Sequence, residues 1–203
     1  MDKIILIGAG GHARACIDVI EQEDRFKIAG LVERDHSITE NNIGYPVIGV
    51  DDDLEILRQK YTYALVTVGQ IKSPETRIKI YKMLKALEYQ LPIVISPSAY
   101  ISKHAEICES TTIMHGVIVN TDARIGANCI INNKALVEHD VKIGDHCHIA
   151  TGAIVNGGVQ VGDGTFIGSG VVTKQGITIR KNCLIGAGCV IKKDLPDNEV
   201  VKN

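Results

Sequence analysis

The sequence predicts an α/β domain with a small parallel sheet over residues 1–95, followed by a repetitive parallel β structure over residues 96–203. Strand-like and helix-like segments alternate in the first part, whereas the second part repeats an apolar residue at every sixth position. The composition agrees with this division. The chain is 45% hydrophobic but only 4% aromatic, as expected for a core of aliphatic side chains on strands.

Length and charge exclude several classes of function. The chain has 203 residues and a formal net charge of −2, so no basic excess points to nucleic acid. No apolar run approaches the length of a membrane span, and the first residues read as a strand rather than as a signal peptide. We therefore expect a cytoplasmic protein with no nucleic-acid partner and no membrane partner, acting on a small molecule.

The first part opens with a strand, a glycine-rich turn and a helix. The apolar run 3–7 precedes Gly8, Gly10 and Gly11, and apolar residues then recur at helical spacing over 13–20. Glycines at this place let backbone N–H groups approach a phosphate at the helix N-terminus. The sheet region ends near residue 92, which is about half of a full NAD site. A nucleotide-linked sugar is therefore favoured over NAD, and a tight turn without a ligand stays open.

Two further strands and a helix complete the first part. We expect strands over 26–32 and 63–68, the first ending at Glu33 and the second at Gly69. Ser73 is expected to cap a helix whose first residue is Pro74 and which continues through residue 86. Alternation of strand and helix at this spacing predicts a parallel sheet, with Glu33 placed to bind a ribose.

The second part has a period of six. From Ile101 to Ile191 every sixth residue is Ile or Val, with Thr173 as the exception, and the position four residues later is usually small. A helix cannot use this period, but a chain that turns a corner every six residues can. Each aliphatic residue then points inward, and the small residue fills the tight space beside it.

The cysteines fit this repeat without any chemistry of their own. Cys129, Cys147 and Cys183 are separated by 18 or 36 residues, so three hexads per coil place them in one internal column. We expect small buried side chains and neither a disulfide nor a metal site. His146 and His148 flank Cys147, but neighbours along a strand point to opposite faces, so the three cannot ligate one ion.

The hexads beginning at Ile125 and Ile143, the leading Gly-Ala-Gly-Gly-His motif and the segment 137–140 together resemble one family of hexapeptide-repeat sugar acetyltransferases. It comprises the sialic acid O-acetyltransferase-like proteins and the nucleotide-linked amino-sugar N-acetyltransferases of the bacillosamine and perosamine pathways. The resemblance covers nearly the whole chain. It implies a Rossmann-like domain that binds the sugar nucleotide, then a left-handed parallel β-helix, with acetyl-CoA as cosubstrate and a homotrimer as the assembly.

His139 is the candidate catalytic residue. It lies two positions after the inward Val137, on the outside of the coil, between the carboxylates of Glu138 and Asp140. Gly157, one coil later, is expected to open space for a ligand above the ring. The resemblance implies that His139 is the general base and that Asp140 raises its basicity.

The resemblance also implies two sets of binding residues. Those for the sugar nucleotide, most probable as a UDP-4-amino-6-deoxy sugar, are Gly10, Gly11, His12, Glu33, Arg34 and Gly69. Those for acetyl-CoA are His148, Gly157, Ser169 and Ala187.

Two departures from the family's pattern affect these expectations. Arg34 replaces a second acidic residue at the nucleoside, and the usual Gly-x-Pro-Ala-Lys segment does not follow the last coil. Lysines near that end are available for the phosphates of CoA, namely Lys174, Lys181, Lys192 and Lys193. Apolar side chains expected on the outside of the coils predict the trimer contacts, namely Ile118, Ile130, Ile154 and Phe166. The alternatives are a sialic acid or related sugar O-acetyltransferase and a non-catalytic nucleotide-binding trimeric module.

Overall fold

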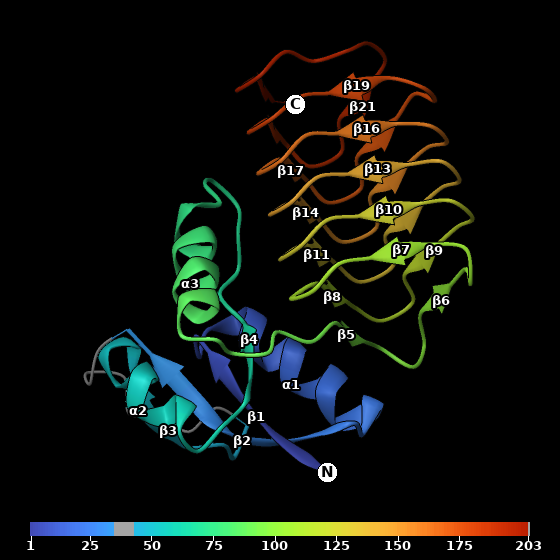
Figure 1. Ribbon diagram of the computed structural model, residues 1–203. Coiled ribbons are helices and arrows are strands. Elements are labelled where there is room, and N and C mark those ends of the chain that lie inside the picture. The colour runs from blue at the N-terminus through green and yellow to red at the C-terminus, as the bar shows by residue number, and fades with distance from the viewer. Residues whose placement is uncertain (35–42, 203) are drawn as a thin grey trace.

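In the computed structural model, which describes residues 1–34 and 43–202, helices and parallel strands come first and a stack of short strands follows (Figure 1). The first part contains a sheet of four parallel strands in the order β3-β2-β1-β4. They are β1 (Asp2–Ile7), β2 (Phe26–Glu33), β3 (Val47–Val50) and β4 (Tyr63–Val66). Because all four strands run in one direction, their carboxyl ends meet at one edge of the sheet. The α/β class predicted from the sequence is confirmed.

Both faces of this sheet are covered by helices. Ile4 and Leu6 of β1 share a core with α1 (Gly11–Glu23), and Ile5 and Ile7 pack on the opposite side with residues of α2 (Leu54–Arg58) and α3 (Glu75–Ala86). A 3-10 turn, η1 (Asp51–Asp53), leads into α2. The continuous apolar sequence of β1 follows from this two-sided burial.

The helix expected from Pro74 starts one residue later, at Glu75. Pro74 already has helical angles (φ −81°, ψ −9°), and the Ser73 hydroxyl accepts a hydrogen bond from the Glu75 N–H at 3.2 Å. The expected strand over 63–68 ends at Val66. Strand β3 and helix α2 were not predicted, because each is too short to show a period.

The second part is a parallel β-helix with three flat faces. Its strands are two residues long, and each pairs with strands 18 residues away, as in Arg124 with Glu106 and Lys142. The β5–β22 face contains β5 (Val94–Ile95), β8 (Thr112–Ile113), β11 (Ile130–Ile131), β14 (His148–Ile149), β17 (Phe166–Ile167), β20 (Leu184–Ile185) and β22 (Val200–Val201). The β6–β21 face contains β6 (Tyr100–Ile101), β9 (Ile118–Val119), β12 (Leu136–Val137), β15 (Ile154–Val155), β18 (Val172–Thr173) and β21 (Val190–Ile191). The β7–β19 face contains β7 (Glu106–Ile107), β10 (Arg124–Ile125), β13 (Lys142–Ile143), β16 (Gln160–Val161) and β19 (Thr178–Ile179).

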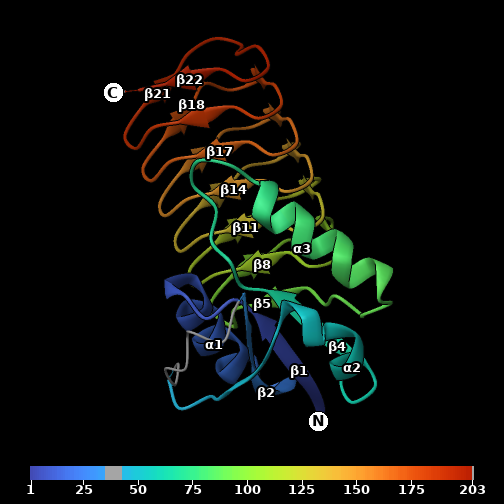
Figure 2. The same ribbon diagram turned by 90° about the vertical axis from the view of Figure 1, so that its left-hand side faces the viewer.

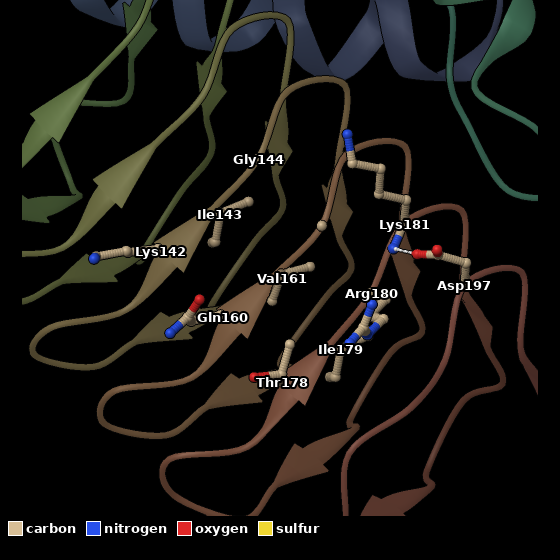
Figure 3. A pocket seen from close by; sticks show the side chains of 11 residues that line it. Lys142, Ile143, Gly144, Gln160, Val161, Thr178, Ile179, Arg180, Lys181 and Asp197 are labelled. Carbon is tan, nitrogen blue, oxygen red and sulfur yellow. Dashed lines mark hydrogen bonds between the residues drawn. The ribbon is translucent and has the colours of Figure 1, made fainter.

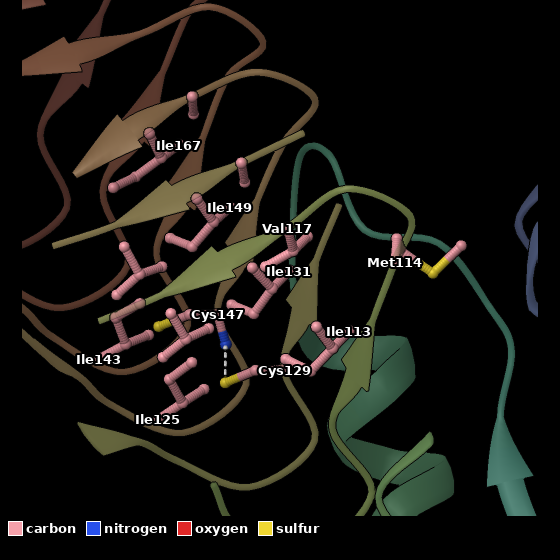
Figure 4. Close-up of a cluster of buried hydrophobic side chains, with 14 of the residues drawn as sticks. Ile113, Met114, Val117, Ile125, Cys129, Ile131, Ile143, Cys147, Ile149 and Ile167 are labelled. Atoms are coloured by element: carbon pink, nitrogen blue, oxygen red, sulfur yellow. Dashed lines mark hydrogen bonds between the residues drawn. The ribbon is translucent and has the colours of Figure 1, made fainter. Parts of the chain in front are cut away.

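The inward columns confirm the six-residue interpretation. Ile113, Ile131, Ile149 and Ile167 are fully buried and lie one above another in the interior (Figure 4). The thiol column lies beside them, where the Cys147 N–H meets the Cys129 sulfur at 3.4 Å. Corners are tight, and a Cβ on Gly144 would lie 2.8 Å from the backbone nitrogen of Asp163 in the next coil. Glycine is therefore required at that corner.

The three faces differ in what covers them. Helix α3 and the segment before it lie against the β5–β22 face (Figure 2). The expectation that Ile130 and Phe166 are exposed is therefore wrong, because Ile130 is fully buried on this covered face and Phe166 is half-buried. Outward residues of the β6–β21 face are apolar and partly or fully exposed, namely Tyr100, Ile118, Leu136, Ile154, Val172 and Val190. The β7–β19 face presents polar or charged residues in the same positions, namely Glu106, Arg124, Lys142, Gln160 and Thr178.

The cysteine column gives a testable result. All six cysteines are free, and Cys108 alone among them is exposed, while burial raises the pKa of the Cys16 thiol to about 12. A thiol-labelling reagent should therefore modify one thiol per native chain, and Cys108→Ser should abolish the labelling seen by mass spectrometry. Labelling of Cys129, Cys147 or Cys183 before unfolding would contradict their burial.

Candidate active site

His139 and Asp140 form a hydrogen-bonded pair at a corner of the β-helix. They follow β12, where the chain passes from the β6–β21 face to the β7–β19 face, and Asp140 adopts the left-handed conformation with φ 61°. The His139 Nδ1 lies 2.8 Å from Asp140 Oδ2. Because a carboxylate can only accept, Nδ1 carries the proton and Nε2 is left as the basic nitrogen.

The surroundings raise the basicity of this imidazole. The hydrogen bond to Asp140 raises the pKa of His139, and the charges of Asp140 and Glu138 act in the same direction. Glu138 does not orient the ring, since its carboxylate accepts a hydrogen bond from Asn120 Nδ2 at 2.9 Å. The imidazole is 55% exposed, so a ligand can reach it.

Gly157 provides the surface on which the His139 ring lies. A Cβ at residue 157 would lie 2.7 Å from both Cε1 and Nε2 of His139. The expectation that Gly157 opens space for a ligand above the ring therefore needs correction, because the ring itself fills that space. The Gly158 N–H is also used, since it donates to the His139 carbonyl at 2.9 Å.

The glycine-rich turn lies at the other end of the molecule, between β1 and α1. Gly8 has φ 105°, and a Cβ there would lie 2.7 Å from the side chain of Val68. Gly10 precedes the first turn of α1 with no side-chain cap, and no atom lies within 4 Å of a Cβ placed on Gly10 or Gly11. The space above this helix N-terminus is therefore open to an anion.

Glu33 holds the turn in place. Its carboxylate is nearly buried and accepts hydrogen bonds from the backbone N–H groups of Ala9 and Arg34. A cavity of about 470 Å³ opens beside it at the carboxyl ends of the strands. Its lining includes apolar side chains and the polar residues Glu33, Arg34, Asp51, Thr76 and Lys79. This cavity has the size and mixed lining of a small-ligand site.

His12 and Gly69 lie side by side where the α/β domain meets the β-helix. A Cβ on Gly69 would lie 3.6 Å from the Cβ of His12, and the His12 Nε2 is 3.5 Å from the sulfur of Cys16. Burial lowers the pKa of His12 to about 3, with the charge of Arg77 acting in the same direction. The ring is therefore neutral near pH 7.

His148 lies on the same side of the molecule. Its Nδ1 donates to the main-chain carbonyl of Gln70 at 2.6 Å, and its ring meets Phe166 edge to face at 5.2 Å. The Nε2 atom is 3.3 Å from Asn132 Nδ2. Burial lowers the pKa of His148 to about 4, so this imidazole is also neutral.

The site residues predicted from the sequence occupy three separate places in one chain. His12, Gly69 and His148 gather at the junction with the α/β domain, while His139 and Gly157 lie at the corner after β12 and β15. Ser169 and Ala187 lie at the corner between the β5–β22 and β6–β21 faces, where the Gly188 N–H donates to the Ser169 carbonyl.

Sequence reasoning missed four polar residues at the junction, namely Gln70, Arg77, Asn128 and Asn132. One signal existed. Arg77 stands three and seven residues before the apolar Ile80 and Leu84, so helical spacing places it on the buried face of α3.

Two other features of the described residues bear on function. Within 1–34 and 43–202, no group of three or more His, Cys, Asp or Glu side chains is arranged to hold a metal ion, and no helix is long and apolar enough to cross a membrane. A pocket of about 450 Å³ lies on the β7–β19 face (Figure 3). Lys142, Arg180 and Lys181 contribute to its lining, and Lys181 is paired with Asp163 at 2.8 Å.

Comparisons with known proteins agree with this geometry. Residues 3–84 match the PglD N-terminal domain. Residues 122–157 and 140–175 match the bacterial transferase hexapeptide (six repeats), and residues 158–193 match the hexapeptide repeat of succinyl-transferase. No curated protein matches the chain.

Three solved structures resemble the whole chain. PerB from Caulobacter crescentus, in complex with CoA and GDP-perosamine, is 32% identical with a TM-score of 0.91, over 98% of this chain and 93% of that chain. The acetyltransferase domain of PglB from Neisseria gonorrhoeae FA1090, in complex with acetyl coenzyme A, is 29% identical with a TM-score of 0.90, over 98% and 94%. WeeI from Acinetobacter baumannii AYE shares the fold at 24% identity and a TM-score of 0.87, over 100% and 98%.

The fold and the repeats define a hexapeptide-repeat transferase with a left-handed parallel β-helix. The chain belongs to the family of sugar N-acetyltransferases that join a PglD-type N-terminal domain to this β-helix. The family resemblance seen in the sequence is thereby confirmed.

The contact between His139 and Gly157 gives a testable result. A methyl group at residue 157 would overlap the imidazole, so Gly157→Ala should displace the ring from Asp140 and lower the pKa of His139, measured by NMR titration. Gly10→Ala is the matched control, since its methyl group meets no atom within 4 Å. An unchanged titration of His139 in the Gly157→Ala protein would contradict the packing described.

Proposed function

We propose that this protein transfers the acetyl group of acetyl-CoA to the amino group of a nucleotide-linked amino sugar. The observation that carries the proposal is the His139–Asp140 pair, which leaves an exposed basic nitrogen on the β-helix of a chain that belongs to this family. The match to PerB, which was solved with CoA and GDP-perosamine, supports this class of substrates.

The chemistry follows from the geometry of His139. The amine attacks the thioester carbonyl, a C–N bond forms, and the His139 Nε2 takes the proton that the amine loses. The C–S bond then breaks, and the CoA thiolate leaves and is protonated. No covalent enzyme intermediate is needed, since neither Cys nor Ser adjoins His139.

Backbone groups near Gly157 are suited to the transition state. The Gly158 N–H is already bonded to the His139 carbonyl, so it cannot serve as an oxyanion donor. In the part of the chain that the structure describes, the Gly157 N–H makes no hydrogen bond. We assign the Gly157 N–H as the donor to the developing oxyanion.

The sugar nucleotide fits the α/β domain. The open N-terminus of α1 beside Gly10 and Gly11 suits the diphosphate, and the neighbouring cavity of about 470 Å³ suits the nucleoside. Glu33 then acts mainly by holding the turn, while Arg34 is exposed at the cavity. The sugar extends from there toward His12 and Gly69.

Acetyl-CoA fits along the corner that carries His139. Lys193 lies in the same corner column, three coils further on, which is about 14 Å at the spacing of parallel strands. An extended pantetheine arm spans a comparable length, so exposed Lys174, Lys192 and Lys193 suit the phosphates. Lys181 lies at a different corner and is paired with Asp163, so it is left out of this site. Ser169, Ala187 and His148 fit the same ligand only when a second copy brings its own corner close.

A homotrimer would complete the site. The β6–β21 face presents an apolar column in which Ile118 is 41% and Val190 60% exposed. Packing three copies around this face brings the His139 corner of one copy to the Ser169 corner of the next. His139 would then act on a sugar held by the neighbouring copy.

A thiol-release assay tests the proposed reaction. Purified protein, acetyl-CoA and a UDP-, GDP- or dTDP-linked amino sugar should release CoA thiol with at least one substrate, and mass spectrometry should find the acetyl group on nitrogen. Acetylation of a hydroxyl group would instead support the sugar O-acetyltransferase. Absence of thiol release with all three substrate classes would leave a nucleotide-binding module.

Two variants test the general base. His139→Ala should lower kcat by about 10² to 10⁴ with little change in KM, because a base acts mainly in the transition state. Asp140→Asn should cost less. It should also move the acidic limb of the pH profile to lower pH, because Asp140 raises the pKa of His139 and its loss lets the base remain unprotonated in more acidic solution. A His139→Ala enzyme within tenfold of wild type above pH 7 would remove His139 from this role.

Gly11→Val tests the sugar-nucleotide loop. The added side chain meets no protein atom within 4 Å, so the melting temperature should not change, but it would occupy the space assigned to the diphosphate. Calorimetry should show the Kd of the sugar nucleotide raised about tenfold or more, a loss of about 1.4 kcal/mol, with acetyl-CoA binding unchanged. Unchanged sugar-nucleotide binding would place that ligand elsewhere.

Light scattering tests the assembly. The native protein should have three times the chain mass of 22.0 kDa, and Ile118→Asp should dissociate it. Gln160→Asp, on the polar β7–β19 face, is the matched control and should leave the mass unchanged. A monomer mass for the wild-type protein at micromolar concentration would contradict the trimer.

A further inference from the structure

Arg77 is a charged side chain buried between the two parts of the molecule. It is 1% exposed, on the face of α3 that otherwise contributes Ile80 and Leu84 to the core. No carboxylate among the described residues forms an ion pair with it. A buried cation is costly unless its N–H groups are hydrogen-bonded, so its partners define what it does.

Those partners come from both parts of the chain. One terminal nitrogen donates to the carbonyls of Val66 at 3.1 Å and Val68 at 2.6 Å, where β4 ends. The other donates to the Asn128 carbonyl at 3.2 Å and to Asn128 Oδ1 at 2.8 Å, at a corner of the β-helix. A single guanidinium therefore joins the carboxyl end of β4 to the β-helix.

The segment that Arg77 holds, residues 66–70, touches every part of the junction. The Thr67 hydroxyl donates to the Gly8 carbonyl at 2.7 Å, in the glycine-rich turn. Gly69 lies beside His12, and the Gln70 carbonyl accepts from His148 Nδ1. The position of this segment therefore sets the position of His12, on the sugar-nucleotide side, relative to His148 on the β-helix.

We propose that Arg77 is a positioning residue for acetyl transfer: by tying the end of β4 to Asn128, it fixes the sugar-nucleotide loop in register with the β-helix. The inference rests on the proposed function. Each ligand has its own site in one part of the chain, and Arg77 touches neither. Its loss should therefore leave each ligand bound but wrongly placed for transfer.

Electrostatics support this assignment. Burial is the main cause that lowers the pKa values of His12, His148 and His146, and the positive charge of Arg77 lowers all three further. The titratable groups facing Arg77 itself are the thiols Cys16 and Cys129, and Asp145 acts on His146 in the opposite direction. Arg77 thus helps to keep His12 and His148 neutral, so that each ring retains one acceptor nitrogen.

The first test separates binding from turnover. In Arg77→Met, kcat should fall at least tenfold, while the Kd values of acetyl-CoA and of the nucleotide sugar, measured separately by calorimetry, should stay within threefold of wild type. Lys82→Met, an exposed position on the same helix, is the matched control and should change none of these values. A wild-type kcat in Arg77→Met, or a kcat loss that follows a loss of ligand binding, would overturn the proposal.

The second test does not depend on activity. NMR titration should show the pKa values of His12 and His148 raised in Arg77→Met but restored in Arg77→Lys, which keeps the charge; kcat should recover only partly, because lysine lacks the two-sided fork. Unchanged histidine titrations in Arg77→Met would contradict the described junction even if the protein proves to have another activity.

If Arg77→Met does not fold, Asn128→Gly provides the same test. Asn128 has φ 54°, which glycine accepts, and the substitution removes the Oδ1 acceptor while keeping the carbonyl. It should lower kcat with little effect on the two Kd values. An Asn128→Gly enzyme with wild-type kcat would likewise overturn the proposal.

Discussion

The stacking of coils 18 residues apart is the constraint on which the rest of the structure depends. Each coil can lie on the next only if the inward aliphatic residues fall in columns, as Ile113, Ile131 and Ile149 do. Because the columns fix the interior, they also fix which outward side chains face one another between coils. The His139 ring lies on Gly157 for this reason, and no long-range contact from the α/β domain is needed to place it.

The α/β domain adds what the repeat cannot supply. A regular coil offers two-residue strands and tight corners, with few concave polar surfaces. The carboxyl edge of the four-stranded sheet offers an open helix N-terminus and a cavity beside Glu33. The two parts meet through buried polar contacts from Gln70 and Arg77 rather than through apolar packing alone, which gives the junction a defined geometry.

Much of this arrangement could be predicted from the sequence, because it is local or periodic. The spacing from Ile101 onward predicted the inward columns, and the three glycines before residue 12 predicted the turn. The contacts of Arg77 with Asn128 and of Gln70 with His148 could not be predicted, since they join residues that are far apart and follow no period. For the same reason Ile130 was expected on the surface. The repeat shows that it points outward, but not that α3 covers it.

The corner at Gly157 also limits how the length of such a chain can change during evolution. An inserted or deleted coil of 18 residues above residue 157 would leave every column below it aligned. A single hexad inserted between His139 and Gly157 would instead rotate the following chain by one face, and a residue from another corner would lie under the imidazole. Few side chains other than hydrogen fit there, because a Cβ would lie 2.7 Å from the ring. Length variation in this part of the gene is therefore expected in whole coils and not in single hexads.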